Sequence, residues 1–574
     1  MKRNQRIALV CGILACALAA TGCSDSGKNA ASTEPSGKAS GSSAASGTAS
    51  GTASASASAP TEKGDPFGKY DPPIELHVAR AVDQTWTYPK GDSIDNNVWY
   101  REYENLLGIK IVHDWTALTS EYNRKLNVSI ASGSLPELFS VSASQLKQLA
   151  DAGQLEDLTG VYEQYASDHT KELQHGDGGA ALASATFNGK LLAIPVVNAP
   201  IYEPNLLWIR TDWLKKLNLS EPKTLDDVLK IAEAFTKQDP DGNGKPDTYG
   251  LAVNNYLYGP ITSITGLSNA FHAYPQTWVK DASGKVVYGS TQPEMKQTLA
   301  KLQEMYKAGE LDREFGVKDG TKVAEDIAAN KFGMAFGANW NPYVFLDAVK
   351  KNPGMDWMPF PVPSVDGTPT KANVGFSASG YVVVRKGAKH PEAAIKMLNL
   401  HEEVVHGSRR NEGQFITVEE NGERINTSPM SLVQSGVSDQ GVLESLTLLR
   451  KAIENEDESL LKDALTETDK YGPTVDYLKT GNIENWAVAH QYFGFVTTMD
   501  NYTGDRLLMT AFGGQTPTMT DKWATLDKLE KETFTKIIMG AASVDEFDTF
   551  VADWNKLGGE AILKEINDWL SAQK

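Results

Sequence analysis

The sequence contains very little cysteine. Only Cys11, Cys16 and Cys23 occur among 574 residues, and all three lie close to the N-terminus. If a leader carrying the first two is removed, Cys23 is the only cysteine of the mature chain, which excludes an intrachain disulfide. Such a protein depends on its hydrophobic cores. The roughly 510 residues from Pro66 onward are too many for one core and suit two large lobes.

Long hydrophobic runs are also missing beyond the first residues. The apolar stretch from Ile7 to Ala20 follows Lys2, Arg3 and Arg6 and is shorter than the about 20 apolar residues that span a bilayer. A basic start, a short apolar segment and small residues are typical of a secretory signal peptide, here residues 1–22. Ala20-Thr-Gly-Cys23 resembles a bacterial lipobox, which predicts lipidation at Cys23. The alternative is a plain secretory peptide with a free Cys23.

Residues 24–64 lack large apolar side chains and consist almost entirely of Ser, Ala, Gly and Thr. Such a segment cannot bury enough apolar surface to fold, so residues 23–64 are predicted to be a disordered linker behind the lipidated cysteine. A flexible coil of this length spans roughly 35 Å. We therefore expect a protein held by lipid at the extracellular face of a bacterial cell membrane.

Positive charge is scarce relative to negative charge. The chain has 55 Lys and Arg against 73 Asp and Glu, giving a formal net charge of -18. Removal of residues 1–22 takes away three further positive charges and no acidic residue. A surface this acidic repels nucleic acid and anionic membranes. We expect a soluble body, monomeric, with no nucleic-acid partner.

Recognisable catalytic motifs are absent. His401 and His406 match a zinc-protease helix only in part, because they are five residues apart and do not share a helix face. Gly375-Phe-Ser-Ala-Ser-Gly380 lacks the spacing of a nucleophile elbow. No nucleophile and base pair stands out, so we expect no enzyme activity. Paired carboxylates for glycoside hydrolysis stay open, since their separation exists only in three dimensions.

Strands and helices alternate along the body, which predicts α/β units around a largely parallel sheet. Strands are expected at residues 74–80, 109–113, 138–141, 189–195, 206–210, 249–253 and 381–385. Helices are expected at 95–107, 121–131, 212–217, 225–235, 391–400, 526–538, 544–557 and 560–572. Thr224 and Asp227 form an acidic variant of a capping box at the start of one helix.

One loop has the spacing of a calcium site. Oxygen-bearing side chains stand at positions 1, 3, 5 and 9 of an EF-hand-like loop, with Gly244 at position 6 and the Lys245 carbonyl at position 7. Position 12 is Gly250 instead of Glu. The alternative is a turn rich in Asp, Asn and Gly without a metal. We predict a structural Ca²⁺ held by Asp239, Asp241, Asn243, Lys245 and Asp247.

Several tryptophans occur in polar loops: Trp86, Trp278 and Trp340, the last within Gly337-Ala-Asn-Trp-Asn-Pro342. An aromatic face beside amides suits a sugar, because its C–H faces stack while its hydroxyls form hydrogen bonds. Each tryptophan has the alternative of lying in the core.

Together these strings resemble extracellular solute-binding lipoproteins, family 1, of carbohydrate ABC importers, a group that includes maltose- and alginate-binding proteins. The resemblance covers about residues 75–570. It is carried by Ala131-Ser-Gly-Ser-Leu-Pro-Glu137, Gly189-Lys-Leu-Leu-Ala-Ile-Pro195, Trp208-Ile-Arg-Thr-Asp-Trp-Leu-Lys-Lys-Leu217, Pro222-Lys-Thr-Leu225, the Asp239–Asp247 loop and Phe534-Thr-Lys-Ile-Ile-Met-Gly540. In alginate-binding relatives the matching loop holds calcium, with an acidic residue where this chain has Thr248.

The resemblance implies a two-lobed periplasmic-binding-protein-like α/β fold of type II, with a ligand cleft and several crossing hinge segments. Residues 65–195 and about 375–512 would form lobe 1, and residues 196–374 and about 513–574 lobe 2. Crossings are expected near Pro195, Gly375 and, roughly, Gly513-Gly514. The residues expected to approach the ligand are Trp86, Tyr202, Tyr256, Trp278, Trp340 and Asn341.

The implied function is capture of a carbohydrate, in particular an oligosaccharide, and its delivery to the membrane permease of an ABC transporter, with lobe closure on binding. Two alternatives stay open at this point. One is a calcium-dependent surface polysaccharide lyase or hydrolase. The other is a sensor that reports sugar occupancy without transport.

Overall fold

The computed structural model describes residues 63–83, 86–410, 415–420, 423–462 and 464–572. The predicted signal peptide, Cys23 and nearly all of the predicted linker lie outside these ranges. Residues 61–574 form one compact unit. Within the described part of the chain, no helix combines the length and the apolar character needed to cross a membrane.

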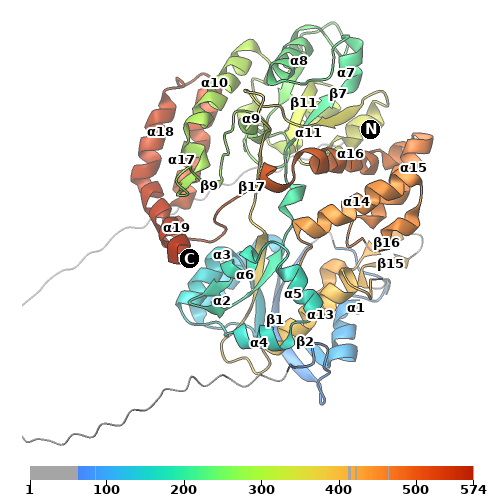
Figure 1. Ribbon diagram of the computed structural model, residues 1–574, viewed down its shortest axis with the longest axis vertical. Helices are drawn as coiled ribbons and strands as arrows, with labels where there is room; N and C mark the ends of the chain where they lie inside the picture. The colour runs from blue at the N-terminus through green and yellow to red at the C-terminus, as the bar shows by residue number, and fades with distance from the viewer. Residues whose placement is uncertain (1–62, 84–85, 411–414, 421–422, 463, 573–574) are drawn as a thin grey trace, which may run out of the picture. The chain divides into compact units, whose positions relative to one another are not determined.

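The first sheet has five strands in the order β2-β1-β3-β14-β6, and Figure 1 labels two of them, β1 and β2. β1 pairs in parallel with β2 and β3, whereas β14 runs antiparallel to both β3 and β6. The core beneath it includes Trp99, Phe139 and Val383. The strands are β1 (Ile74–Val82), β2 (Ile109–Leu118), β3 (Leu138–Val141), β6 (Ile194–Val197) and β14 (Ala378–Val384).

Local capping residues mark several helix ends around this sheet. Ser142 caps α3 in a capping box with Gln145, and Gly108 and Gly133 adopt left-handed backbone conformations at two helix ends. The helices are α1 (Val98–Glu102) with a π-helical continuation (Tyr103–Leu107), α2 (Thr119–Ser132), α3 (Ala143–Asp151), α4 (Thr159–Tyr165), α5 (Asp168–Gln174), α6 (Ala180–Ser184) and α13 (Glu392–Val405). Two short hairpins accompany them, β4–β5 (Thr186–Phe187, Lys190–Leu191) and β15–β16 (Thr417–Glu420, Glu423–Asn426).

The second sheet has four strands in the order β12-β7-β11-β8. β7 runs antiparallel to both of its neighbours, and β8 pairs in parallel with β11. Every residue of β7 and β11 is buried, as expected for strands covered on both faces. The strands are β7 (Leu206–Arg210), β8 (Tyr249–Ala252), β11 (Phe332–Gly337) and β12 (Trp357–Phe360).

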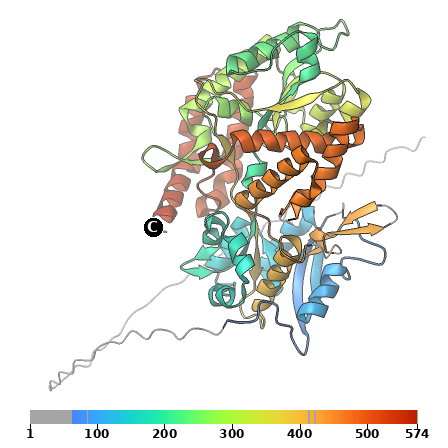
Figure 2. The same cartoon turned by 45° about the vertical axis from the view of Figure 1, so that its right-hand side comes forward.

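The helices around the second sheet come from two distant parts of the chain. Figure 2 shows the C-terminal helices in red beside the green helices, and α17 packs on both α10 and α18. Thr224 and Asp227 form the predicted capping box of α8. The helices are α7 (Thr211–Lys216), α8 (Leu225–Lys237), α9 (Thr265–Ala270), α10 (Pro293–Ala308), α11 (Gly320–Ala328), α12 (Pro342–Lys351), α17 (Pro517–Ile538), α18 (Glu546–Trp554) and α19 (Glu560–Ala572), with hairpin β9–β10 (Trp278–Lys280, Val286–Tyr288).

Three further helices, α14 (Asp439–Asn455), α15 (Tyr471–Thr480) and α16 (Trp486–Asn501), pack together. α14 shares a core with Ala199 and Ile201, which follow β6. α16 packs on β7, β12 and α12. The predicted lobe boundary near residue 512 grouped α16 with the first sheet, whereas the structure packs this helix on the second.

The chain passes between the two sheets at two short segments. Residues 198–205 connect β6 to β7, and residues 361–377 connect β12 to β14 by way of β13 (Ala372–Val374). These two stretches are the crossing segments. β13 pairs in parallel with β17 (Leu507–Met509), which leads into α17. The chain passes from the first sheet to the second for a third time through α14–α16. Gly513 follows these helices, and a side chain at this position would collide with Phe376.

Candidate functional site

A cavity of about 510 Å³ lies against both crossing segments and the adjoining wall of the second sheet's domain. This volume suits a ligand of a few sugar units in a partly open groove. The cavity is lined by Tyr202, Glu203, Asn205, Tyr258, Gly259, Pro260, Thr265, Pro275, Gln276, Thr277, Trp278, Trp340, Asn373, Val374, Gly375, Thr510 and Phe512.

Three of the six ligand residues predicted from the sequence line this cavity. Tyr202 lies on the first crossing segment, and its hydroxyl donates to Glu467 Oε1 at 2.8 Å. Trp340 lies between β11 and α12 and is partly exposed. Trp278 begins β9 and packs on Tyr288 with ring centroids 4.9 Å apart. The structure therefore gathers aromatic faces from segments that are far apart in the sequence.

The wall between residues 254 and 277 has an unusual backbone. Leu257, Thr262, His272 and Gln276 all have positive φ angles between 44° and 67°, a region that non-glycine residues rarely adopt and that is common at functional sites. Asn254 holds this loop closed, because its side-chain amide donates to Ile261 O at 2.8 Å. The loop thus presents Tyr258, Gly259 and Pro260 to the cavity.

Polar side chains of the cavity are mostly amides and hydroxyls. The Asn373 amide donates to Pro275 O at 3.1 Å and to Thr277 Oγ1 at 2.8 Å. Its side-chain oxygen is buried and has no hydrogen-bond partner among the described residues. An unpaired buried acceptor costs free energy until it is bonded.

Glu203 is the one charged residue among those lining the cavity. The backbone N–H of Gly375 donates to Glu203 Oε2 at 2.5 Å, so this carboxylate joins the two crossing segments. A Cβ added at Gly375 would lie 3.0 Å from that oxygen, a tight contact that would require the Glu203 side chain to shift slightly. Burial raises the pKa of Glu203, and the nearby charge of Asp439 acts in the same direction.

A second carboxylate supports the cavity from behind. Glu530 of α17 is fully buried and accepts hydrogen bonds from the hydroxyls of Tyr258, Tyr288 and Ser290. Ser290 in turn accepts the backbone N–H of Gln276 at 2.8 Å. Glu530 therefore positions two lining residues, Tyr258 and Gln276, and the tyrosine on which Trp278 packs. Burial raises the pKa of Glu530 to about 7.

The other three predicted ligand residues lie elsewhere. Tyr256 is 52% exposed and meets Tyr258 edge to face, with the Lys531 ammonium 4.1 Å from its ring centroid. Asn341 is buried and donates to Pro260 O at 2.7 Å, so it supports the lining loop from outside the cavity. Trp86 lies beside the first sheet, with the Arg80 guanidinium 5.2 Å from its ring centroid.

Glu203, Asn373 and Glu530 were not anticipated from the sequence. Each occurs in a short string without a motif, and the roles of Glu203 and Glu530 arise from contacts with segments more than 150 residues away. The one local signal was the position of Glu203 directly after Tyr202, on the predicted first crossing.

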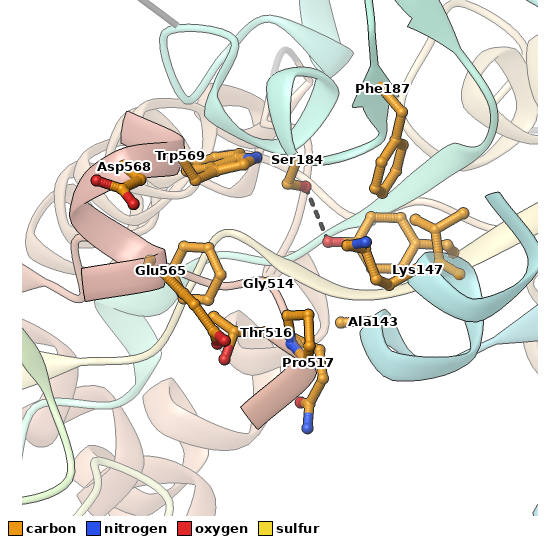
Figure 3. Close-up of a pocket in the computed structure, with 14 residues that line it drawn as sticks. Ala143, Lys147, Ser184, Phe187, Gly514, Thr516, Pro517, Glu565, Asp568 and Trp569 are labelled. Atoms are coloured by element: carbon orange, nitrogen blue, oxygen red, sulfur yellow. Dashed lines mark hydrogen bonds between the residues drawn. The ribbon is translucent and has the colours of Figure 1, made fainter. Parts of the chain in front are cut away.

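A smaller cavity of about 330 Å³ lies between α3, α6 and α19 (Figure 3). Its walls include Phe187, Phe512 and Trp569, and the Ser184 and Tyr381 hydroxyls bond at 2.8 Å. Charged side chains at this cavity are Lys147, Glu565 and Asp568, and Gln515 supplies its one amide side chain. A polyhydroxylated ligand needs many hydrogen-bonding partners, so the larger cavity, with three amides and several hydroxyls, suits a sugar better.

The predicted calcium loop connects α8 to β8. Backbone N–H groups of Gly242, Asn243 and Gly244 donate to the Asp239 carboxylate at 3.0–3.1 Å. The Asn243 amide donates to Asp241 Oδ2 at 2.7 Å and to Asp247 Oδ1 at 3.0 Å. Three carboxylates and an amide therefore share one small loop.

The charge of this loop fits a hard cation. Burial, together with the neighbouring carboxylates of Asp239 and Asp247, raises the pKa of Asp241. A bound cation would relieve this repulsion and take oxygen ligands from the same side chains. Thr248 does not contribute a ligand, because its buried hydroxyl donates to Phe235 O at 2.8 Å. Over the described ranges, no three His, Cys, Asp or Glu side chains gather as metal ligands by themselves.

The imperfect zinc-like motif is a buried polar cluster. His401 and His406 are buried around Glu402, with the two imidazole centroids 6.1 Å apart. Both nitrogens of His401 face hydroxyl or carbonyl oxygens of Ser431 and Ser435. Burial lowers the pKa of His401 to about 3 and raises that of Glu402 to about 8. His401 and Glu402 are therefore largely uncharged at pH 7, as their place inside the first lobe requires.

Comparison with known proteins gives sequence relatives among bacterial binding proteins. Lipoprotein LipO of Bacillus subtilis (strain 168) is 25% identical over 498 residues, 84% of this chain and 90% of LipO. The polygalacturonan/rhamnogalacturonan-binding protein YtcQ of the same organism is 29% identical over 240 residues, 41% of this chain and 46% of YtcQ. The fructooligosaccharide ABC transporter substrate-binding protein FusA of Streptococcus pneumoniae serotype 4 is 28% identical over 243 residues, 39% of this chain and 43% of FusA.

Solved structures share the fold. An HMO binding ABC-transporter associated solute-binding protein of Bifidobacterium longum infantis has a TM-score of 0.59 at 16% identity, covering 87% of this chain and 98% of that one. The alginate-binding protein AlgQ2, solved without calcium ion, has a TM-score of 0.56 at 17% identity, covering 88% and 99%. An EF-hand mutant of S. pneumoniae FusA with fructo-nystose has a TM-score of 0.56 at 19% identity, covering 87% and 100%. The predicted two-lobed α/β fold is thereby confirmed.

A family profile described as bacterial extracellular solute-binding protein matches residues 102–400, which is more than half of the chain.

Proposed function

This chain belongs to the bacterial extracellular solute-binding proteins, and we propose that it captures an oligosaccharide at the cell surface and delivers it to the permease of an ABC transporter. The observation that carries the proposal is the cavity at the crossing segments, where Trp278, Trp340 and Tyr202 meet amide and hydroxyl groups. Aromatic faces beside hydrogen-bonding side chains recognise the two kinds of surface that a sugar presents.

The position of the cavity favours a binding protein whose lobes move on occupancy. Tyr202, Glu203, Asn373 and Gly375 lie on segments that connect the two sheets. A ligand bonded to these residues therefore changes the free energy of the connection itself, which is how hinge closure couples to binding. The relatives FusA and YtcQ, whose names describe binding of oligo- or polysaccharides, support the same assignment.

Capture without turnover distinguishes this function from a surface hydrolase or lyase. A glycoside hydrolase uses a pair of carboxyl groups about 5–9.5 Å apart, and the lining residues of the described cavity include one, Glu203. We expect purified protein to bind labelled oligosaccharides saturably, measured by calorimetry, and to release them unchanged after prolonged incubation, measured by chromatography. Product formation would overturn the proposal in favour of an enzyme.

We further propose that Ca²⁺ binds the Asp239–Asp247 loop and stabilises the connection between α8 and β8. Asp239, Asp241, Asn243, Asp247 and the Lys245 carbonyl would supply oxygen ligands, with water completing the shell in place of an acidic residue at 248. The calcium-related and EF-hand descriptions of AlgQ2 and FusA support this assignment.

We also propose lipid attachment at Cys23, which would keep the protein beside its permease. LipO, a relative over 84% of this chain, is named a lipoprotein. In cells, Cys23→Ala should move the protein from the membrane fraction to the medium, while the affinity of the purified body for its ligand stays the same. Retention in the membrane fraction would contradict lipidation at this residue.

A further inference from the structure

The cavity at the crossing segments contains a single charge, and that charge is negative. Glu203 is the one acidic residue among the lining residues, and no Lys, Arg or His accompanies it. The carboxylate is held in place by the Gly375 N–H at 2.5 Å and by the Asn198 amide at 3.4 Å. Its position is therefore fixed with respect to anything that enters the cavity.

The surroundings of Glu203 add further negative charge. Asp439 lies near enough to act on Glu203 electrostatically, and its carboxylate accepts the N–H of Ile201 on the same crossing segment at 2.8 Å. Two lysines on other segments, Lys470 and Lys531, each form an ion pair with an aspartate. Lys470 lies 2.8 Å from Asp469, and Lys531 lies 2.8 Å from Asp527. Neither lysine is among the residues that line the cavity.

Neutral sugars and uronates would interact with this cavity in opposite ways. A neutral sugar donates a hydroxyl proton to Glu203, which keeps this acceptor hydrogen-bonded inside the cavity. A uronate brings a second carboxylate into a partly dehydrated space whose lining residues supply an anion and no cation. Like charges in one cavity repel, because water screens them less there than in bulk solution.

We propose that this protein selects uncharged oligosaccharides and rejects uronates, and that Glu203 is the residue that enforces the selection. The inference rests on the proposed function and narrows it to one substrate class. Glu203 then has two tasks, accepting a ligand hydroxyl and excluding a ligand carboxylate, and both follow from its fixed place between the crossing segments.

The test uses matched probes that differ only in charge. Neutral oligosaccharides of three to five sugar units are screened by calorimetry, and each one that binds is compared with the same compound after oxidation of its primary hydroxyls to carboxylates. Oligogalacturonides and their methyl esters form a second matched pair. We expect neutral probes to bind, and each acidic partner to bind at least about tenfold more weakly.

Glu203→Gln tests the residue itself, because glutamine keeps an acceptor for the Gly375 N–H and removes the charge. We expect this variant to reduce the preference for the neutral member of a pair about tenfold or more. Glu310→Gln is the matched control, since Glu310 is likewise a poorly exposed glutamate whose pKa burial raises, but it does not line the cavity. The control should leave the preference unchanged.

The possible results distinguish a failure of the proposed preference for neutral sugars from a failure of the proposed oligosaccharide binding. Acidic probes that bind as well as or better than neutral ones would overturn the selection while leaving oligosaccharide capture intact. An unchanged preference in Glu203→Gln would show that Glu203 does not enforce it. Failure of every neutral and acidic probe to bind would overturn the proposed function, and the selection with it.

Discussion

Replacing Glu530 by glutamine should flatten the pH dependence of stability. Glu530 lies fully buried in α17 beneath the cavity wall and accepts the hydroxyls of Tyr258, Tyr288 and Ser290. Burial is the main cause of its raised pKa, outweighing these three hydrogen bonds, which act in the opposite direction. Glutamine has nearly the same shape and keeps one acceptor oxygen, so the substitution removes the ionisation with little change in volume.

The magnitude follows from the two pKa values of this side chain. An unburied glutamate titrates near 4.5, and Glu530 in the folded protein titrates at about 7. Between these values the folded state holds a proton that the unfolded state has lost, so stability decreases as the pH rises. At about 1.4 kcal/mol for each pH unit, the gap of about 2.5 corresponds to roughly 3 kcal/mol. This contribution is fully present below pH 4.5 and lost above pH 7.

Urea unfolding at pH 5, 6, 7 and 8 measures this difference. Relative to Glu530→Gln, the wild-type protein should lose about 2 to 3 kcal/mol of unfolding free energy between pH 5 and pH 8, since part of the total is already lost at pH 5. Glu402, whose pKa burial raises to about 8, contributes a decrease in the same direction to both proteins, so only their difference reports on Glu530. Glu532→Gln on the same helix is the control, because Glu532 forms only an exposed pair with Lys528 at 3.7 Å.

Wild-type and Glu530→Gln curves that run parallel over this pH range would refute a raised pKa for Glu530. A wild-type protein that gains stability relative to the variant as the pH rises would be equally incompatible with it, because it would mean that the folded state favours the charged carboxylate.

Three other predictions concern the cavity and the loop. Trp340→Ala should weaken binding of a neutral oligosaccharide about tenfold, because one stacking face is lost. Calorimetry measures the Kd. An unchanged Kd with an unchanged melting temperature would show that Trp340 does not contact the ligand. Gly375→Ala brings a methyl group within 3.0 Å and 3.2 Å of the two Glu203 carboxylate oxygens and displaces this side chain. We expect a loss of about 1–3 kcal/mol in unfolding free energy together with weaker binding. Wild-type values for both quantities would show that the contact between Gly375 and Glu203 is dispensable. Chelation of Ca²⁺ should lower the melting temperature of the wild-type protein and leave that of Asp241→Asn nearly unchanged. The reason is that a ligand that binds the folded state stabilises it in proportion to occupancy. A chelator that does not change the melting temperature of the wild type would argue against a structural ion.

Local pattern predicted several strands and helices of both sheets, but few of the segments that line the cavity. The strands at 138–141 and 206–210 have the predicted bounds, and α8 begins at Leu225 behind the predicted capping box of Thr224 and Asp227. The predicted helix at 95–107 is instead a short α-helix continued by a π-helix, ending at Gly108 as expected. The first sheet is less uniformly parallel than predicted, because β14 returns from the second sheet and enters between β3 and β6 in the opposite direction.

The path of the chain after residue 437 was beyond local pattern. The sequence of α14–α16 favours helices but does not indicate which sheet they pack on. The core that α16 shares with Trp208, Phe345 and Trp357 places it on the second sheet. The assignment of a lobe to such a helix depends on which apolar surface it meets, and periodicity carries no information about that partner.

By itself the sequence predicted what is encoded locally: a signal peptide over residues 1–22 followed by Cys23, a disordered linker, alternating strands and helices, and a loop dense in carboxylates. It also named Trp278 and Trp340, because aromatic residues in polar loops are visible without a fold, and the family resemblance added Tyr202. Only the tertiary structure decided that these three line one cavity while Trp86 lies beside Arg80. It alone gave Glu203 its place against Gly375. The physical reason is that a binding site depends on distances between segments that the chain brings together from far apart, and these distances are set by packing of the two cores.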